Sequence, residues 1–421
     1  MRKSICDKIV LSTLVVSMFV SGCGTNTDTS NTNNDNSQKE KVTLSLWGAK
    51  EDSELLQKIV SNFKEKYQDS ADFDITISPE SELTCKDTVL SNPEGAADVY
   101  TFAEDQLDEL VKAKALMPIT EDKDAIIEAC GGKDSPAIEA ASSNGTLYAY
   151  PLTSSNGYFM FYNSKYFSKK DVKSLDQMLA LAAKNGKKVT MDFTSGWYTY
   201  SFFKGAGLDV YKDTDTNTNI CNWNATDTTY TGVDVLNSML SIAKNSGFKS
   251  ATDEEFVSGI KDGSIIAGVS GTWNAKTVQD KFGDGYAACM LPTYTLKGKQ
   301  VQMHSVVGYK EVGVNAHTKN TKWAQRLASW ITNEENQKLR FKERGEAPAN
   351  QKAANTNEVQ DSPAISALSK QSKYGHIQKV TDSFWVPVCR MGTIILAGNP
   401  KNKDLQQLLN ETVDKIQAKE K

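Results

Sequence analysis

The sequence predicts an α/β fold in which mostly parallel sheets are flanked by helices. Runs of strand-forming residues alternate with segments of helical periodicity from residue 42 to residue 118, which is typical of a doubly wound sheet. A second stretch, from residue 158 onward, repeats this alternation. The chain has 421 residues, which is enough for two domains after an N-terminal leader.

The elements follow one another in a regular order. Apolar residues at helical spacing predict the first helix, with Ser53 as its N-cap, and Pro118 closes the third. The predicted strands are residues 42–47, 73–77, 97–102, 158–162, 189–193, 265–269, 286–291 and 306–314. The predicted helices are residues 55–67, 85–90, 107–115, 175–183, 275–281, 323–341 and 405–416.

The first 22 residues have the pattern of an export signal. Arg2, Lys3 and Lys8 precede an apolar run at residues 9–20, which is shorter than the roughly 20 residues of a membrane span. Small residues then come directly before Cys23, an arrangement that resembles a bacterial lipobox. On that resemblance Cys23 becomes the acylated N-terminus of the mature protein. The alternative is an ordinary signal peptide followed by a chance cysteine.

Residues 23–41 are predicted to be a flexible linker. Between residues 24 and 38 no apolar side chain is larger than the methyl group of threonine, so the segment cannot bury enough surface to offset its ordering entropy. Such a linker would let a folded body move above the membrane to which Cys23 is attached.

Charge and cysteine content exclude several classes of protein. The formal net charge is −4 and the leader is basic, so the body is acidic and nucleic acid is not expected as a partner. The body holds five cysteines at irregular spacing with no C-x-x-C pair, which indicates neither a disulfide framework nor a zinc site. They are Cys85, Cys130, Cys221, Cys289 and Cys389.

No set of residues matches a catalytic, cofactor or metal motif. The three histidines are far apart in the sequence, and residues 268–272 lack the last glycine of a nucleophile elbow. Residues 205–207 lack the third glycine of a dinucleotide fingerprint. A calcium loop beginning at Asp213 would need glycine where Thr218 stands and glutamate where Asn224 stands. We therefore expect no enzyme activity, no cofactor and no metal.

Aromatic residues instead gather in polar, glycine-flanked positions near the ends of predicted strands. In open α/β sheets the carboxyl ends of strands face the ligand crevice. Flat rings beside amides, hydroxyls and carboxylates suit a pyranose, whose C–H faces stack and whose hydroxyls hydrogen-bond. Any single ring could instead belong to the core. The aromatics are Trp47, Phe102, Trp197, Tyr198, Tyr200, Trp273, Phe384 and Trp385.

Several runs together resemble the maltose/maltodextrin-binding lipoproteins of ABC sugar importers, in the Gram-positive branch of the extracellular solute-binding family. The runs cover nearly the whole body in the order of the family. They are residues 97–107, 150–152, 156–163, 267–273, 291–294, 308–315 and 384–385.

The resemblance implies a set of sugar-contacting residues. The loop after the first strand, with Trp47, Lys50, Glu51 and Asp52, matches a loop that gives polar contacts. Phe102 stands in place of a stacking tryptophan, Asp105 in place of a hydroxyl-binding aspartate, and Gln106 in place of an arginine. Either Trp197 or Tyr198 matches an aromatic subsite residue, and Trp273 and Trp385 match two stacking tryptophans. Arg390 lies one residue from a family arginine, and Ser155 replaces a glutamate found in some members.

The family fold has two α/β lobes, as in periplasmic binding proteins, with the ligand cleft between them and three chain crossings. These crossings are expected near residues 153–154, 293–299 and 348–350. Lobe one would then be residues 42–153 plus 300–349, and lobe two residues 154–299 plus 350–421.

The implied function is capture of malto-oligosaccharides by a monomer anchored through lipid to the extracellular face of the cell membrane, with delivery to ABC permease subunits. The alternatives are a surface glycoside hydrolase acting on α-glucans and a binding protein for a different oligosaccharide. A hydrolase needs two carboxylates about 5–10 Å apart across the scissile bond, and no such pair is recognisable in the sequence.

Replacing Cys23 with alanine should release the protein from the membrane or leave it unprocessed, because two acyl chains anchor stably and the variant can carry none on this residue. Membrane fractionation and the mass of the mature protein measure this. An unchanged mass and membrane fraction would contradict lipid attachment at Cys23.

Overall fold

Two five-stranded sheets organise the computed structural model, which describes residues 39–213, 216–377 and 379–419. The first sheet has the order β2 (Ala71–Pro79), β1 (Glu40–Gly48), β3 (Val99–Ala103), β17 (Lys310–Val314) and β6 (Ala149–Thr153). Four of these strands run in one direction, and β17 alone among the five is antiparallel to both of its neighbours.

The second sheet repeats this design with a different part of the chain. Its order is β11 (Phe248–Lys249), β8 (Lys188–Thr190), β12 (Ile265–Gly271), β7 (Tyr158–Asn163) and β13 (Tyr286–Cys289). Strand β7 is antiparallel to β12 and β13, while β8 is parallel to β11 and β12. Each sheet is therefore mostly parallel with one reversed strand in its interior.

The remaining elements cover or extend the sheets. The helices are α1 (Ser53–Lys66), α2 (Cys85–Ser91), α3 (Leu107–Lys112), α4 (Lys123–Ala129), α5 (Pro136–Ala140), α6 (Leu175–Lys184), α7 (Gly196–Gly205), α8 (Gly232–Ala243), α9 (Asp253–Lys261), α10 (Ala275–Phe282), α11 (Thr321–Ile331), α12 (Glu334–Arg344), α13 (Gln351–Ala354), α14 (Asn357–Gln360), α15 (Pro363–Gln371), α16 (Trp385–Leu396) and α17 (Leu405–Ile416). The short strands are β4 (Ser142–Ser143), β5 (Thr146–Leu147), β9 (Val210–Asp213), β10 (Thr218–Cys221), β14 (Thr293–Leu296), β15 (Lys299–Gln302), β16 (Ser305–Val306) and β18 (Gly375–His376).

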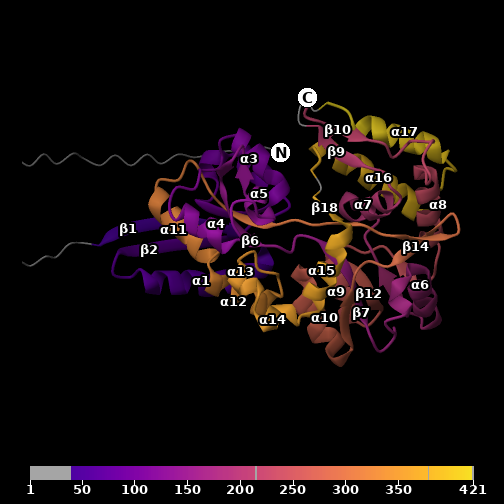
Figure 1. The fold of residues 1–421 in the computed structure, drawn as a ribbon, viewed down its shortest axis with the longest axis horizontal. Helices are drawn as coiled ribbons and strands as arrows, with labels where there is room; N and C mark the ends of the chain where they lie inside the picture. Colours follow the sequence, from indigo (N-terminus) through magenta and orange to yellow (C-terminus); the bar gives the residue numbers. More distant parts are fainter. Residues whose placement is uncertain (1–38, 214–215, 378, 420–421) are drawn as a thin grey trace, which may run out of the picture. The chain divides into compact units, whose positions relative to one another are not determined.

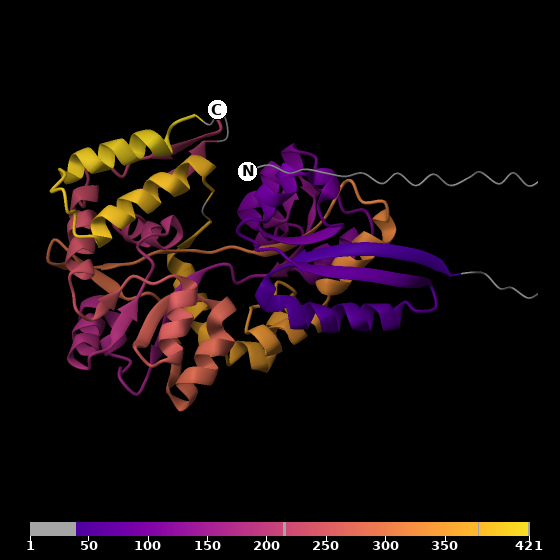
Figure 2. The same ribbon diagram turned by 180° about the vertical axis from the view of Figure 1, so that it is seen from behind.

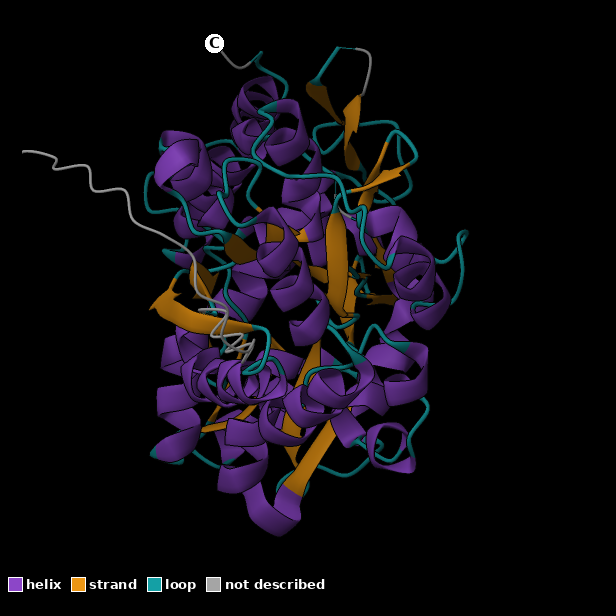
Figure 3. Ribbon diagram, turned by 90° about the vertical axis from the view of Figure 1, so that its left-hand side faces the viewer, coloured by secondary structure: helices purple, strands orange, loops and turns teal. Residues whose placement is uncertain are grey.

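Helices flank the strands of both sheets (Figures 1 and 3). On the first sheet, α1 packs against β2, and α11 packs against β3, β6 and β17. Helix α1 does so because its apolar residues recur every three or four positions and are buried together. These are Leu55, Leu56, Ile59, Val60 and Phe63.

On the second sheet, α6 packs against β8, α9 against β12 and α15 against β13. Helices α7, α8, α16 and α17 pack on one another (Figure 2). The ring of Phe203 on α7 stacks on that of Trp223, in the segment before α8, with centroids 3.9 Å apart. Each sheet thus lies in its own apolar core.

The mixed α/β fold agrees with the prediction, and most predicted elements are present. Five details are wrong. Asp52, not Ser53, precedes α1 as its N-cap, and the third predicted helix ends at Lys112. Strand β8 ends at Thr190, because the chain turns there towards α7.

The other two errors concern breaks within predicted elements. Residues 306–314 form two strands in different sheets, β16 and β17, because residues 307–309 leave one sheet for the other. Residues 323–341 belong to two helices, α11 and α12, which are separated at Thr332 and Asn333. Asn333 caps the second helix by accepting a hydrogen bond from the backbone N–H of Asn336.

The predicted signal, Cys23 and most of the linker lie outside the described residues. Within the described ranges, no helix is both long and apolar enough to cross a membrane. The five body cysteines are free thiols.

Candidate ligand-binding site

The predicted contact residues follow the ends of strands in both sheets. Strand β1 runs into a 3-10 turn at Lys50–Asp52, and β3 runs into one at Glu104–Gln106. In the second sheet, β12 runs into a 3-10 turn at Thr272–Asn274. Strands β1 and β3 are parallel, so their carboxyl ends share an edge of the first sheet.

Trp273 and Tyr198 meet at one carboxylate that sequence reasoning missed. The indole Nε1–H of Trp273 donates to Asp253 Oδ2 at 3.1 Å, and the hydroxyl of Tyr198 donates to the same oxygen at 3.3 Å. Trp273 is partly exposed, whereas the side chain of Tyr198 is buried. Burial raises the pKa of Asp253, and these hydrogen bonds oppose that effect.

Trp197 and Trp385 are also partly exposed and lie near each other. A Cβ placed on Gly196, the residue before Trp197, would come 3.4 Å from the ring of Trp385. The backbone carbonyl of Trp197 accepts a 2.9 Å hydrogen bond from the hydroxyl of Tyr158, and Trp385 packs edge-on against Phe384. Trp197 and Trp273 follow β8 and β12, which are parallel strands of the second sheet, so both come after the same edge of that sheet.

The loop after β1 divides into exposed and buried parts. Lys50 and Glu51 are exposed, and Trp47 is partly buried against the first core. Asp52 is only 2% exposed, and both of its carboxylate oxygens are engaged. Arg344 Nε donates to Oδ1 at 2.9 Å, and Arg340 donates to Oδ2.

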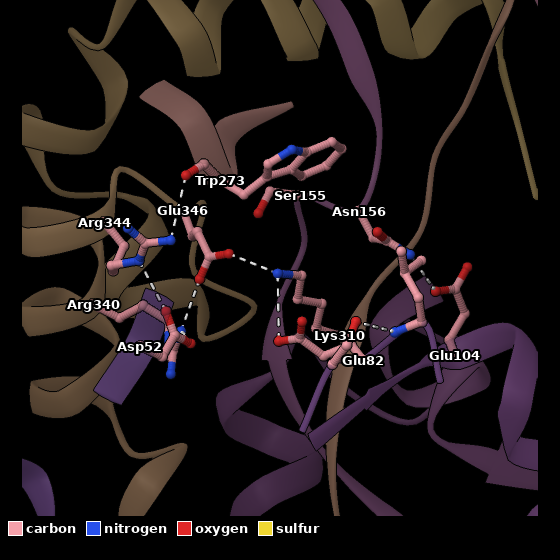
Figure 4. Close-up of polar contacts among 12 residues, drawn as sticks. Asp52, Glu82, Glu104, Ser155, Asn156, Trp273, Lys310, Arg340, Arg344 and Glu346 are labelled. Carbon is pink, nitrogen blue, oxygen red and sulfur yellow. Dashed lines mark hydrogen bonds and ion pairs between the residues drawn. The ribbon is translucent and has the colours of Figure 1, made fainter. Parts of the chain in front are cut away.

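A buried charge network extends from Asp52 into the first sheet (Figure 4). Arg340 also pairs with Glu346 at 2.8 Å, and Glu346 pairs with Lys310 of β17 at 2.8 Å. Lys310 lies 3.5 Å from Glu82. Burial alone would raise the pKa of Glu346, but Lys310 and Arg340 hold it below the usual range. Burial raises the pKa of Glu82.

This network reaches the second sheet through Arg344. Its NH2 group donates a 3.4 Å hydrogen bond to the backbone carbonyl of Trp273 (Figure 4). One predicted site residue, Asp52, is thereby connected to another, Trp273, through an arginine that sequence reasoning did not single out.

The end of β3 and the turn after it differ from the predicted arrangement in the exposure of their side chains. Phe102 is completely buried, with its ring centroid 6.0 Å from that of Tyr100, so it offers no face to a ligand in this conformation. Asp105 is exposed. Gln106 is buried, and its side chain accepts a 3.0 Å hydrogen bond from the backbone N–H of Lys86 and donates to the backbone carbonyl of Glu82. Gln106 therefore supports the chain around α2.

Glu104, between these residues, is a buried carboxyl that accepts hydrogen bonds from the backbone N–H of Tyr309 at 2.9 Å and from the side-chain amide of Asn156 at 3.3 Å. Burial, with the charge of Asp105 as a second cause, raises the pKa of Glu104 to about 8. The carboxyl of Glu104 thus contacts the segments that lead into β17 and β7, through Tyr309 and Asn156 respectively.

A second ionic contact joins the elements of the two sheets. Lys86 of α2 donates to both carboxylate oxygens of Asp382 at 2.8 and 2.9 Å, and to Glu109 at 3.0 Å. Asp382 begins the 3-10 turn Asp382–Phe384, which leads directly to Trp385. Sequence reasoning missed this pair because its residues are almost 300 positions apart, and no local pattern marks either one.

The other predictions concern Arg390 and the absence of a metal site. Arg390 is exposed on α16. Among the described residues, no group of three or more metal-ligating side chains is close enough to hold an ion. A cavity of about 350 Å³ lies between α10, α12 and α15 and contains none of the predicted contact residues. The roles of the predicted residues stay predictions.

The sequence matches the family model of the bacterial extracellular solute-binding proteins over residues 58–367. The chain therefore belongs to this family of extracellular proteins, and its two sheets with flanking helices are those of a two-lobed solute-binding protein.

The chain is also similar to individual proteins and solved structures. A structure solved with acarbose has a TM-score of 0.78 and 30% identity, over 90% of this chain and 99% of that one. A maltodextrin-binding protein from L. casei BL23, solved without ligand, has a TM-score of 0.73 and 25% identity, over 90% and 100%. The galactooligosaccharide-binding protein of Bacillus subtilis (strain 168) is 31% identical over 163 residues, and this match spans only 38% of each protein.

Replacing Glu104 with glutamine should reduce the pH dependence of stability. Because the folded state raises the pKa of Glu104 from 4.5 to about 8, the native protein keeps a proton that the unfolded chain releases between those values. Its contribution to stability is complete below pH 4.5 and is lost as the pH rises through 8. Glu104→Gln, which cannot ionise, should therefore lose less stability than the parent between pH 5 and pH 8.5.

Urea unfolding at several pH values measures this difference, with Glu54→Gln as the control because Glu54 is exposed on α1. Parallel pH profiles for the parent and Glu104→Gln would show that Glu104 is ionised in the native protein.

Proposed function

We propose that this protein captures malto-oligosaccharides outside the cell and delivers them to the permease of an ABC transporter. The observation that carries the proposal is the group of partly exposed tryptophans, Trp197, Trp273 and Trp385, next to hydrogen-bonding side chains. Stacking rings with polar groups at their edges suit the two surfaces of a glucose unit. The similarity to a maltodextrin-binding protein and to a structure solved with acarbose supports an α-glucan.

The predicted contacts that are buried fit different roles. Tyr198 is buried and bonded to Asp253, which favours Trp197 as the aromatic of that subsite. Asp52 is paired with two arginines, which supports a role in holding the loop around Lys50 and Glu51. These two exposed residues, with Asp105, would supply polar contacts from lobe one.

The relative from Bacillus subtilis supports a second candidate ligand, a galacto-oligosaccharide. Both classes are pyranose chains, and they differ in the orientation of ring hydroxyls. Among the matched relatives, those whose descriptions state a function are binding proteins, which argues against a surface hydrolase. We further propose that the protein is a monomer and that a lipid on Cys23 attaches it to the cell membrane.

Two lobes joined by neighbouring chain crossings would allow the cleft between them to close on a bound sugar. Ser154 donates its backbone N–H to the carbonyl of Ala347 at 2.9 Å and its hydroxyl to the carbonyl of Pro348 at 2.9 Å. The backbone N–H of Asn156 donates to the carbonyl of Gly308 at 3.1 Å. Three segments far apart in sequence thus lie side by side, which supports crossings near residues 153–154 and 348–350.

The middle crossing is better placed later than residues 293–299. That stretch belongs to the hairpin β14–β15, which packs against α6 and α8. Val301, Met303 and Val306 lie in the core of the second sheet. We therefore propose that lobe one takes up the chain at about residues 307–309, with the other lobe boundaries as predicted.

Replacing Trp273 or Trp385 with alanine should weaken maltotriose binding about tenfold or more, because a buried aromatic anchor contributes on the order of 1–3 kcal/mol. Isothermal titration calorimetry measures this with maltose, maltotriose, longer maltodextrins and a galacto-oligosaccharide. Tyr211→Ala is the control, since Tyr211 is 50% exposed on the β9–β10 hairpin. The sugar should be recovered intact.

A parent protein that binds no α-glucan, or folded tryptophan variants that bind like the parent, would refute the proposed ligand or the proposed subsites respectively. Degradation of the sugar would favour the hydrolase.

Saturating sugar should also reduce the radius of gyration, because a ligand that touches both lobes favours the closed form by its differential affinity. Small-angle X-ray scattering with and without maltotriose measures this change. Trp273→Ala, at the same sugar concentration, is the comparison. An identical scattering profile from a protein whose melting temperature rises with sugar would exclude hinge closure.

A further inference from the structure

The carboxylate of Asp253 accepts hydrogen bonds from four side chains. These side chains come from strand β12, the 3-10 turn that follows it and helix α7. Oδ1 accepts from the hydroxyl of Ser270 at 2.7 Å and from the amide of Asn274 at 3.1 Å. Oδ2 accepts from the indole of Trp273 at 3.1 Å and from the hydroxyl of Tyr198 at 3.3 Å. We infer that Asp253 is a positioning residue that fixes the ring of Trp273 for sugar stacking, an inference that rests on the proposed function.

The carboxylate has no acceptor position left for a ligand. An ionised carboxyl offers about four lone-pair sites, and the four donors occupy them. Asp253 therefore acts on a sugar through Trp273 and does not contact it directly.

The helix that carries Asp253 does not depend on it. Helix α9 is capped by Thr252, whose hydroxyl accepts from the backbone N–H of Glu255, while the carboxylate of Glu255 accepts from the backbone N–H of Thr252. This reciprocal capping box satisfies the start of the helix. The side chain of Asp253 is thus available to bind the aromatic residues.

Trp273 is held at both ends. Its indole nitrogen is fixed by Asp253, and its backbone carbonyl is fixed by Arg344 of α12 at 3.4 Å. An indole N–H is only a donor, so it needs an acceptor at this position. A fixed ring loses less conformational entropy when a sugar binds, which improves affinity without any added contact.

Asp253→Asn tests this because asparagine has nearly the same shape but replaces one acceptor oxygen with an NH₂ group. That group would face either Trp273 and Tyr198 or Ser270 and Asn274. The first arrangement leaves the indole without an acceptor. The second removes the acceptor of the Ser270 hydroxyl and one of the two acceptors of the Asn274 amide, which also donates to Ser270 Oγ at 3.0 Å. Glu254→Gln is the matched control, since Glu254 is the next residue, has the same charge and is exposed.

We expect Asp253→Asn to weaken maltotriose binding about tenfold and Glu254→Gln to leave it within about twofold of the parent. In ¹⁵N NMR spectra recorded without sugar, the indole signal of Trp273 should shift in Asp253→Asn and stay in place in Glu254→Gln. In a Trp273→Phe background, which lacks the indole N–H, Asp253→Asn should lose most of its effect on affinity.

Parent-like affinity in folded Asp253→Asn, or an undiminished effect in the Trp273→Phe background, would overturn the inference. If Asp253→Asn does not fold, Asp253→Glu is measured in the same way, and failure of both to fold would make Asp253 a structural residue and overturn it too. If the parent binds no sugar, the proposed function fails, whereas the indole signal still reports whether Asp253 fixes Trp273.

Discussion

The pairing of Arg340 and Arg344 with Asp52 is the interaction on which the rest of the proposed site depends. Asp52 ends the turn after β1, both arginines lie on α12, and Arg344 continues to the backbone of Trp273. Removing one partner of a buried ion pair typically costs about 3–5 kcal/mol, because it leaves an uncompensated charge. The charges alternate from Asp52 through Arg340 and Glu346 to Lys310. This alternation makes burial of so many ionised groups tolerable.

The network also separates residues that hold the site from residues free to bind. Lys50 and Glu51 share a turn with Asp52, but they are exposed while Asp52 is enclosed. A similar division occurs around β12, where both carboxylate oxygens of Asp253 are engaged and the nearby Trp273 is partly exposed. In both places the buried carboxylates hold neighbouring side chains in position. Aromatic rings and a few exposed polar groups are then left to contact a ligand.

The sequence predicts the fold well where periodicity is local. The spacing of Leu55, Ile59 and Phe63 defines α1, and short runs of apolar residues, aromatic ones in β7, define strands in both sheets. It fails at residues 306–314, since a continuous apolar run does not reveal that its two halves join different sheets. For the site, the aromatics stand out by composition. Asp253, Arg344 and the Lys86–Asp382 pair do not, because their roles arise only from tertiary contacts between distant segments.

The reversed strand in each sheet has a mechanical consequence. Both β7 and β17 directly follow a proposed crossing between the two lobes, and each is hydrogen-bonded to a strand on either side. A torque at the crossings is therefore delivered to the middle of a sheet, where ladders on both flanks resist distortion, and not to a free edge. If the two lobes move as proposed, each sheet would turn as a stiff unit, and bending would fall to the residues between β6 and β7, to those between β16 and β17, and to the crossing near residues 348–350.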